Sequence, residues 1–167
     1  LKNQESEAAG IIYASTRKEV EEICEWLNHN HFKAVRYHAG LSEQERQMNQ
    51  ELFLFDEVPI MVATNAFGMG INKPNVRFVI HYALPATIES YYQEAGRAGR
   101  DGLESDAILL FSPNDLRIRN FLIEQSEGDE AHKEHEYEKL RQMQAYTSAE
   151  TCLQRYILQY FGDEEIG

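Results

Sequence analysis

Two arginines beside two glycines are the residues of this chain with the clearest chemistry. Residues 90–102 read SYYQEAGRAGRDG, which places Arg97 and Arg100 directly after Gly96 and Gly99. On a helix, residues three apart lie on one face, and each guanidinium presents a planar fork of donors that fits phosphate oxygens. The pair therefore predicts binding to a polyanion. The alternative is a structural pair bonded to carboxylates at the end of a helix.

A second polar segment lies upstream, where residues 62–74 read VATNAFGMGINKP. It leaves a short apolar run, and ligands of open parallel sheets bind beyond the carboxyl ends of the strands. Thr64 could offer its hydroxyl and its backbone N–H to a nucleic-acid phosphate, a contact that positions the chain without reading sequence. The alternative is a tight connection from a strand to the next helix.

The elements that would position these residues alternate along the chain. Short apolar runs at 10–14, 34–37, 60–63, 78–81 and 107–111 predict strands, and amphipathic stretches separate them. This alternation is typical of a parallel sheet covered by helices. Several of the runs are apolar at nearly every position, as expected of strands buried on both faces.

Capping sequences indicate where the helices begin. A hydroxyl residue precedes each amphipathic stretch, with a glutamate three residues later or a proline close by; these residues are Thr16, Ser42, Thr87 and Ser112. The second of these helices is expected to bury Met48, Leu52 and Phe55. Cys24 lies in the core stripe of the first helix, which predicts a buried hydrophobic residue.

The composition changes near Glu124, and the sequence QSEGD at 125–129 is typical of a linker. Beyond it, two amphipathic helices are expected to form a hairpin. The first carries Tyr137, Leu140 and Met143, and the second carries Leu153, Tyr156, Ile157, Tyr160 and Phe161. Thr147, with Glu150 three residues later, is expected to cap the second helix. The predicted fold class is α/β with a helical hairpin appended.

Length and charge narrow the possible classes of protein. A chain of 167 residues with 43% hydrophobic content can hold one domain and a small appendage. No apolar run approaches the roughly 20 residues that span a bilayer, so no membrane partner and a cytosolic location are expected. The net charge of −12 argues against a surface that is basic throughout. It leaves room for local phosphate contacts, and weak DNA affinity is expected of this chain alone.

Several signatures of catalysis and metal binding are missing or misleading. The chain has no G-x-x-x-x-G-K-[ST] loop, so it cannot cradle a triphosphate in the manner of a P-loop. Residues 129–132 spell DEAH, but they follow a polar linker rather than a buried strand, which marks the match as coincidence. His132 and His135 are expected to lie on a solvated helix face. Cys24 and Cys152 give no disulfide framework.

The two polar segments, with GIIYASTR at 10–17 and YHAG at 37–40, resemble motifs IV to VI of superfamily 2 helicases. The amino-acid sequences of these motifs are similar to those of the RecQ branch, and the resemblance runs from about residue 10 to residue 161. It implies an α/β fold in which residues 1–124 form the second RecA-like motor domain of an ATP-dependent 3′–5′ DNA helicase. Residues 125–167 would begin the RecQ zinc-binding subdomain.

The resemblance also implies partners in the full-length protein. A first RecA-like domain, missing from this chain, would hold ATP and Mg²⁺, so the isolated chain is expected to be inactive. The first residue is Leu1 rather than methionine, as at the boundary of a fragment. DNA, as a single strand and as a duplex junction, is the implied partner. The implied location is the bacterial cytoplasm at the nucleoid, with the eukaryotic nucleus as the alternative.

Residue roles follow from the same resemblance. Arg100 would be the arginine finger that stabilises charge on the γ-phosphate, Arg97 would be its partner, and Gln93 would join their polar network. Gly70 and Asn72 would approach the bound nucleotide, although many related helicases carry aspartate where this chain has Asn72.

DNA-backbone contacts are implied for Thr64, Ser15, Arg17 and His38. Ser15 or Thr16 could instead only cap a helix. His38 could instead form a hydrogen bond inside the sheet. Tyr91 and Tyr92 could stack on bases, but packing is expected for at least one of them.

Cys152 stands where the RecQ family has the first of four zinc-binding cysteines. By periodicity alone it is a small helix residue. A lone thiolate cannot build the tetrahedral site that structural zinc requires. Cys152 is therefore expected to bind Zn²⁺ in the intact protein and to be a free thiol in this chain.

Two other functions remain compatible with the sequence. A RecA-like module that only docks a partner would share the fold and the acidic surface, but it has no chemical need of two arginine forks. An RNA helicase or a chromatin remodeller would share the general motifs. The sequences GMGINKP and YFGD and the position of Cys152 resemble RecQ proteins more than either of these classes.

Overall fold

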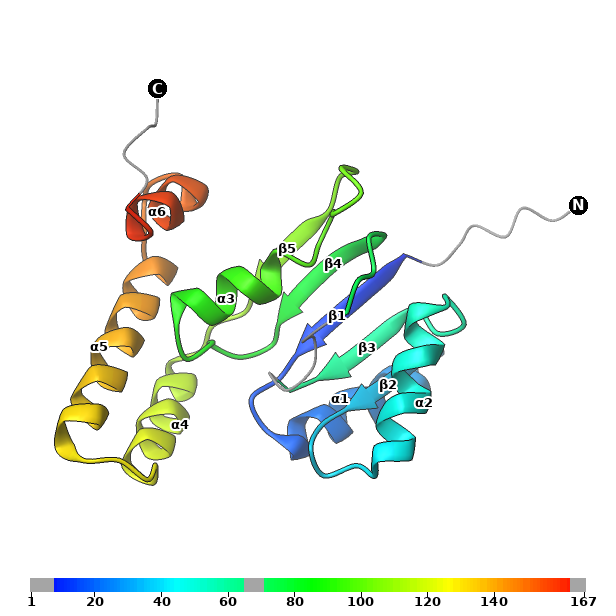
Figure 1. Cartoon of the computed structure of the whole chain (residues 1–167), viewed down its shortest axis with the longest axis horizontal. Coiled ribbons are helices and arrows are strands. Elements are labelled where there is room, and N and C mark those ends of the chain that lie inside the picture. The colour runs from blue at the N-terminus through cyan, green and yellow to red at the C-terminus, as the bar shows by residue number, and fades with distance from the viewer. Residues whose placement is uncertain (1–7, 65–70, 163–167) are drawn as a thin grey trace, which may run out of the picture. The chain divides into compact units, whose positions relative to one another are not determined.

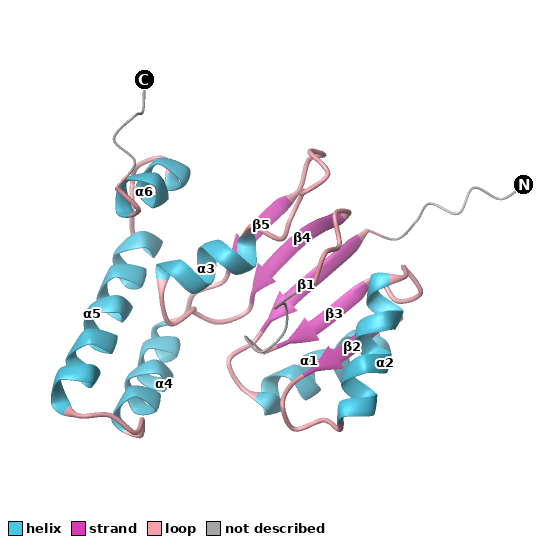
Figure 2. Ribbon diagram, viewed as in Figure 1, coloured by secondary structure: helices cyan, strands magenta, loops and turns pink. Residues whose placement is uncertain are grey.

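All five described strands lie within the first 110 residues, interspersed with helices α1, α2 and α3, and helices alone follow (Figures 1 and 2). The computed structural model describes residues 8–64 and 71–162. Its elements are β1 (Ala9–Tyr13), α1 (Arg17–His29), β2 (Ala34–Tyr37), α2 (Glu43–Leu54), β3 (Ile60–Ala63), β4 (Val76–His81), α3 (Ile88–Ala95), β5 (Asp106–Leu109), α4 (Pro113–Glu124), α5 (Glu130–Thr147) and α6 (Leu153–Tyr160). The chain folds as two compact units, Leu1–Ala83 with Glu94–Leu110, and Leu84–Gln93 with Phe111–Gly167.

The first unit is built on a single parallel sheet with strand order β2-β3-β1-β4-β5. The expected parallel α/β architecture is confirmed, and the bounds of β2 and β3 are those expected from the sequence. Because all strands run the same way, their carboxyl ends meet at one edge of the sheet. That edge receives the segments after β1, β2 and β3, which carry the residues expected to bind DNA.

Both faces of the sheet are buried at its central strands β1 and β3, as the apolar runs predict, whereas the edge strand β5 is largely exposed. On one face Ile11 and Met61 pack with Phe53 of α2, and on the other Ile12 and Val62 pack with α1. Neighbouring positions of a strand point to opposite faces, so the continuous apolar runs serve both layers at once. The sheet therefore forms a rigid base for the loops at its edges.

The N-terminus of α1 is fixed by the expected capping box. The Thr16 side chain accepts a hydrogen bond from the Glu19 N–H at 3.2 Å, and the Glu19 carboxylate accepts one from the Thr16 N–H at 3.1 Å. Such caps contribute about 1 kcal/mol. Cys24 is buried, as expected, and burial raises the pKa of its thiol.

The core-facing side of α2 differs from the expected one. The helix buries Asn49 and Phe53, whereas Met48 and Phe55 are 55% and 72% exposed. Asn49 is buried because its amide donates to the backbone oxygen of Arg36 at 2.9 Å. Phe55 lies outside the core because the helix has ended at Leu54. The expected stripe was therefore wrong by one position.

Gly10 allows an aromatic ring to lie over β1. It pairs with Phe78 of β4, and a Cβ atom added at position 10 would overlap the Phe78 ring. Aromatic side chains cover cross-strand glycines in this way. The register between β1 and β4 shifts between Ala9 and Gly10, at the same place.

After Phe111, the described residues of the second unit form helices α4, α5 and α6 and the segments that connect them. The Ser112 cap and the proline at the first turn of α4 are confirmed, and the Thr87 hydroxyl accepts from the Ser90 N–H at the start of α3. The expected box at Thr147 is wrong, because α5 continues through that residue and its hydroxyl donates to Gln144 O. Cys152 takes the N-cap position of α6 without a side-chain hydrogen bond.

Aromatic and charged side chains hold the second unit together. The Tyr146 ring contacts Tyr91 at 5.3 Å and Tyr156 at 5.6 Å between centroids, which joins α5 to α3 and α6. Tyr91 is buried, so its packing role is confirmed. Lys139 Nζ lies 2.9 Å from the Tyr160 hydroxyl, which supports the expected pairing of the last two helices. Within the described residues, no helix is long and apolar enough to cross a bilayer.

Candidate functional site

The two candidate arginines lie in a turn, not on a helix. Helix α3 ends at Ala95, and residues 96–102 form turns. Gly99 has φ +65°, and a Cβ atom there would lie 2.9 Å from the backbone oxygen of Leu103. An L-residue rarely adopts this conformation, so the expected helical face was wrong at this position. The glycines shape a tight turn that presents the arginines.

Hydrogen bonds to the start of β4 fix this turn. The Gly99 N–H donates to Val76 O at 2.9 Å, and the Asp101 N–H donates to Pro74 O at 3.2 Å. Arg77 Nη2 donates to Asp101 Oδ1 at 2.6 Å. The residue between these anchors, Arg100, is therefore held beside the segment that precedes β4.

Arg100 and Arg97 differ in exposure. Arg100 is exposed, and its Nε donates to Gly96 O at 3.2 Å. Arg97 is half-buried against the Tyr13 phenol. Among the described residues, neither arginine forms a salt bridge to a carboxylate. The alternative of a structural pair bonded to carboxylates is therefore not supported.

Asp56 clamps the segment that leads into β4. Its Oδ1 accepts from Lys73 Nζ at 2.5 Å and from Asn75 Nδ2 at 3.0 Å. The Lys73 side chain is only 3% exposed, and its ammonium lies 5.1 Å from the centroid of the Phe53 ring. Exposed Asn72 lies next to this clamp. Asn72 and Arg100 therefore both flank the amino end of β4.

Replacing Asp56 with asparagine is expected to lower the free energy of unfolding by about 1–3 kcal/mol near neutral pH, because buried Lys73 loses its charged acceptor. Asp56 has φ +60°, a conformation that asparagine tolerates. The hydrogen bond from Lys73, with that from Asn75, holds the pKa of this carboxyl below its usual value. The stabilisation is therefore complete above about pH 4 and is lost as the pH falls through the lower, folded-state pKa.

Urea unfolding of both forms between about pH 7 and pH 3 checks this prediction, and the difference between them should shrink toward acid. Glu57→Gln is the matched control, because Glu57 is an exposed carboxylate on the next residue. A destabilisation of Asp56→Asn that stays constant across this range would contradict the assignment.

The residues expected to bind DNA gather at the carboxyl edge of the sheet. Thr64 follows β3, and its backbone N–H donates to Tyr37 O at 3.2 Å. The expectation that this N–H is available to a phosphate was wrong, so only the Thr64 hydroxyl remains for that role. Arg17 opens α1 and is exposed. A Cβ atom at Gly40 would lie 3.3 Å from Arg17 Cδ, so the segments after β1 and β2 meet there.

Ser15 and Thr16 have separate roles. Thr16 is the cap of α1, whereas the Ser15 N–H donates to Glu19 Oε2 at 3.0 Å and the residue is half-buried. The glutamate thus ties down both backbone N–H groups before the helix. The Ser15 side chain is placed at the edge of the sheet without being the cap.

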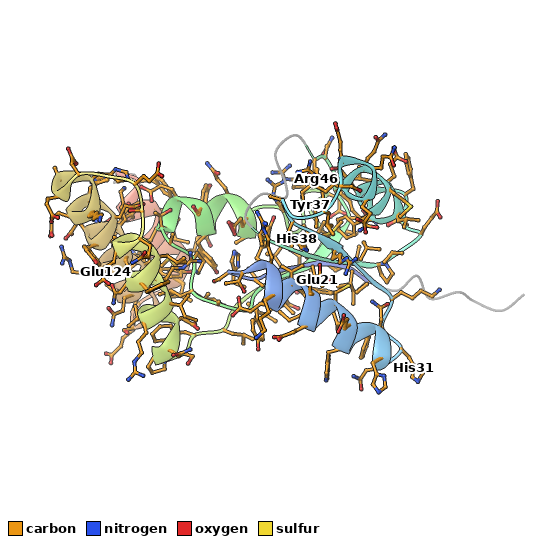
Figure 3. All side chains as sticks on the ribbon, turned by 90° about the horizontal axis from the view of Figure 1, so that it is seen from below. Glu21, His31, Tyr37, His38, Arg46 and Glu124 are labelled. Atoms are coloured by element: carbon orange, nitrogen blue, oxygen red, sulfur yellow. The ribbon has the colours of Figure 1, made fainter. Side chains whose placement is uncertain are left out.

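His38 is buried at 5% exposure, and both ring nitrogens are engaged. Nε2 donates to Glu21 Oε1 at 2.6 Å, and Nδ1 accepts from the Gly40 N–H at 3.1 Å, so the ring is a neutral tautomer. Figure 3 shows His38, the residue after β2, near Glu21 of α1. At this edge of the sheet, the His38 ring holds the loop at Gly40 through the hydrogen bond to the Gly40 N–H.

Glu21 also pairs with Arg36, which lies on β2 two residues before His38. Burial raises the pKa of Glu21, but the hydrogen bond from His38 and the charge of Arg36 outweigh it, so the pKa stays below its usual value. Sequence reasoning missed both this pair and the Asp56 clamp. Neither has a local signal, because each joins residues at least 15 positions apart.

The remaining candidate residues have mixed outcomes. Gln93 is exposed on α3. Gly70 lies outside the described residues. Asp129 of the DEAH string is the N-cap of α5 and accepts from the His132 N–H at 2.8 Å, which confirms a structural role.

Cys152 is exposed at the start of α6. Within residues 8–64 and 71–162, no group of three or more His, Cys, Asp or Glu side chains could hold a metal ion. One thiol does not fit structural zinc, which takes four ligands.

Comparison with known proteins identifies the family. A family model of the helicase conserved C-terminal domain matches residues 1–102, and one of the RecQ zinc-binding domain matches residues 113–166. The ATP-dependent DNA helicase RecQ of Bacillus subtilis (strain 168) is 57% identical over 157 residues. The chain belongs to the RecQ family of superfamily 2 helicases.

Other RecQ relatives and solved structures agree. The ATP-dependent DNA helicase RecQ of Pasteurella multocida (strain Pm70) is 44% identical over 158 residues, with 94% of this chain covered. The match to the Bacillus protein covers 94% of this chain and 26% of that protein. The match to the Pasteurella protein covers 25% of that protein, so the chain spans about a quarter of the length of each relative. A DEAD box protein from the hyperthermophile Methanococcus jannaschii has a TM-score of 0.59 at 28% identity, over 72% of this chain and 33% of that one. The RecA-like fold is thereby confirmed.

Proposed function

We propose that this chain is the second motor domain of an ATP-dependent 3′–5′ DNA helicase, with residues 1–124 forming the motor and residues 125–167 beginning the zinc-binding subdomain. The observation that carries the proposal is exposed Arg100, which lies in a glycine-shaped turn after α3. Hydrogen bonds tie this turn to the start of β4, and Arg100 is not paired with a carboxylate among the described residues. A module that only docks a partner has no use for such an unpaired guanidinium.

Arg100 acts on a triphosphate that the first RecA-like domain holds in the full-length protein. Charge develops on the γ-phosphoryl oxygens during its transfer to water, and a guanidinium placed there lowers the barrier. Arg97 is the second donor, and Asn72 and Gln93 approach the nucleotide. Mg²⁺, when bound by the first domain, neutralises phosphate charge.

The carboxyl edge of the sheet binds the DNA backbone. Exposed Arg17, the Thr64 hydroxyl and Ser15 offer donors there, while His38 acts through the Gly40 loop. Such contacts position the strand without reading sequence, as a translocating motor requires. ATP-driven opening and closing of the two motor domains then moves the DNA.

Cys152 is proposed as one zinc ligand of the full-length protein. Its exposed position at the start of α6 leaves the thiol accessible to ligands from outside the described residues. Binding of the metal would add to the stability of the second unit.

The isolated chain is expected to show no ATP hydrolysis above background, because the P-loop belongs to the first domain. The measurement is phosphate release from ATP and Mg²⁺ with single-stranded DNA present. The full-length protein at equal concentration is the positive control. Appreciable turnover by the chain alone would overturn the assignment of a half-motor.

A further inference from the structure

Four side chains form a polar cluster inside the first unit, and of these only Arg97 has a part in the proposed chemistry. Tyr13 ends β1, His81 ends β4, Glu94 lies in the last turn of α3, and Arg97 lies in the turn that follows. Tyr13 and His81 are 3% and 2% exposed. Polar groups this deeply buried are expensive to desolvate unless they are paired, so their arrangement calls for a role.

Sheet register brings the two rings together. Tyr13 and His81 are direct partners in the β1–β4 pairing. Their rings stack with centroids 5.3 Å apart and an angle of 20° between planes. The Tyr82 N–H donates to Tyr13 O at 2.8 Å, which extends the pairing by one residue. The Tyr13 ring is therefore held between rigid elements.

The carboxylate of Glu94 fixes the imidazole. His81 Nε2 lies 2.8 Å from Glu94 Oε2, and the two side chains are 2% and 13% exposed. Because an ionised carboxylate only accepts hydrogen bonds, the proton lies on Nε2. A buried pair of this kind contributes little net stability, since desolvation offsets the attraction. Its stronger effect is to fix orientation.

Arg97 completes the cluster. Its guanidinium forms a hydrogen bond with the Tyr13 phenol, and burial raises the pKa of that phenol even though the charge of Arg97 opposes the change. Arg97 Nε is buried without a hydrogen-bond partner among the described residues. An unsatisfied buried donor is unfavourable, so neighbouring groups must hold the guanidinium in this orientation.

We propose that Tyr13, itself fixed by the His81–Glu94 pair, is a positioning residue that holds the Arg97 guanidinium in its working orientation for ATP hydrolysis. The inference rests on the proposed function of Arg97. Glu94 lies only three residues before Arg97 in the sequence. The Glu94 carboxylate also reaches Arg97 through space, because it binds His81, His81 stacks on Tyr13, and Tyr13 contacts the Arg97 guanidinium. The hydroxyl of Tyr13 forms the hydrogen bond with the Arg97 guanidinium.

The test removes that hydroxyl and keeps the ring. In the full-length protein, Tyr13→Phe is expected to lower kcat for DNA-stimulated ATP hydrolysis about tenfold to a hundredfold, with little change in KM for ATP, because a displaced catalytic group costs transition-state stabilisation. Tyr82→Phe is the matched control, since it removes the hydroxyl of a tyrosine that is 48% exposed. Its kcat should equal that of the wild type.

A double-mutant cycle separates positioning from general damage to the fold. If Tyr13 acts through Arg97, then Tyr13→Phe should have no further effect in an Arg97→Ala background. In the 167-residue chain, the Arg97 Nε–H resonance should be protected from exchange in the wild type and lose that protection in Tyr13→Phe. Glu94→Gln should weaken the protection as well.

The outcomes distinguish this inference from the proposed function. A large loss in Arg97→Ala with none in Tyr13→Phe would overturn the positioning role and leave Arg97 in place. Full activity of Arg97→Ala would overturn the proposed role of Arg97 and the inference with it. Additive losses in the double variant would show that Tyr13 acts on the fold rather than on Arg97.

Discussion

Replacing Arg100 with alanine in the full-length protein is expected to lower kcat for ATP hydrolysis by about 10³- to 10⁵-fold, the range of arginine fingers in related phosphoryl transfers. Binding of a non-hydrolysable ATP analogue should change little, because the P-loop domain supplies most of the contacts to the nucleotide. The physical reason is that the guanidinium meets charge that develops only in the transition state. Steady-state hydrolysis and equilibrium binding together measure both parts.

Two further variants sharpen this experiment. Arg100→Lys keeps the positive charge and loses the planar fork, so it should recover only part of the rate. Arg117→Ala removes an exposed arginine of α4 and should leave hydrolysis unchanged. Hydrolysis that survives Arg100→Ala would place the finger on another residue.

Replacing Phe53 with alanine is expected to lower the free energy of unfolding by about 3–5 kcal/mol, because the ring fills the core between α2 and the sheet. Its side chain is fully buried, packs with Ile11 and Met61, and lies under the Lys73 ammonium. The variant would leave a cavity and a buried charge with less contact. Urea unfolding followed by circular dichroism measures the midpoint and the slope.

The residue that caps the carboxyl end of α2 provides the control for that experiment. Phe55 lies two residues later and is 72% exposed, so Phe55→Ala should change the unfolding free energy by less than about 0.5 kcal/mol. The two substitutions remove the same atoms. Equal losses at the two positions would contradict the observed packing of α2.

The sheet was predictable from the sequence because its strands are short apolar runs between polar segments. In a buried parallel strand the apolar run largely determines the first and last residue. Accordingly, β2 and β3 begin and end where the predicted runs do. The caps at Thr16 and Ser112 were predictable because each is a local hydrogen-bond pattern within four residues. Local physics suffices for such features.

The errors arose where tertiary contacts override local patterns. Asn49 is buried in α2 because a backbone oxygen of β2 meets its amide, which no helical periodicity reveals. Thr147 resembles a cap, yet α5 continues through it because Met143 and Tyr146 are buried on the same side. Gly99 ends the expected helical face because its backbone takes a left-handed conformation.

The candidate site shows the same division. Residue type and spacing singled out the arginines, and the parallel sheet explains why Thr64 and Arg17 share an edge. The contacts that orient them join distant parts of the chain, as in Asp56 with Lys73 and Glu21 with His38. Thr64 shows the reverse case, since a backbone donor assumed to be available is used by the neighbouring strand.

The ring of Phe78 occupies the volume that any side chain on residue 10 would need. The two positions are therefore not independent during sequence divergence. A larger residue at position 10 is compatible with the fold only when a smaller one stands at position 78. In related sequences, a larger side chain at position 10 should therefore occur together with a smaller one at position 78, so that the total volume of the two side chains stays nearly constant.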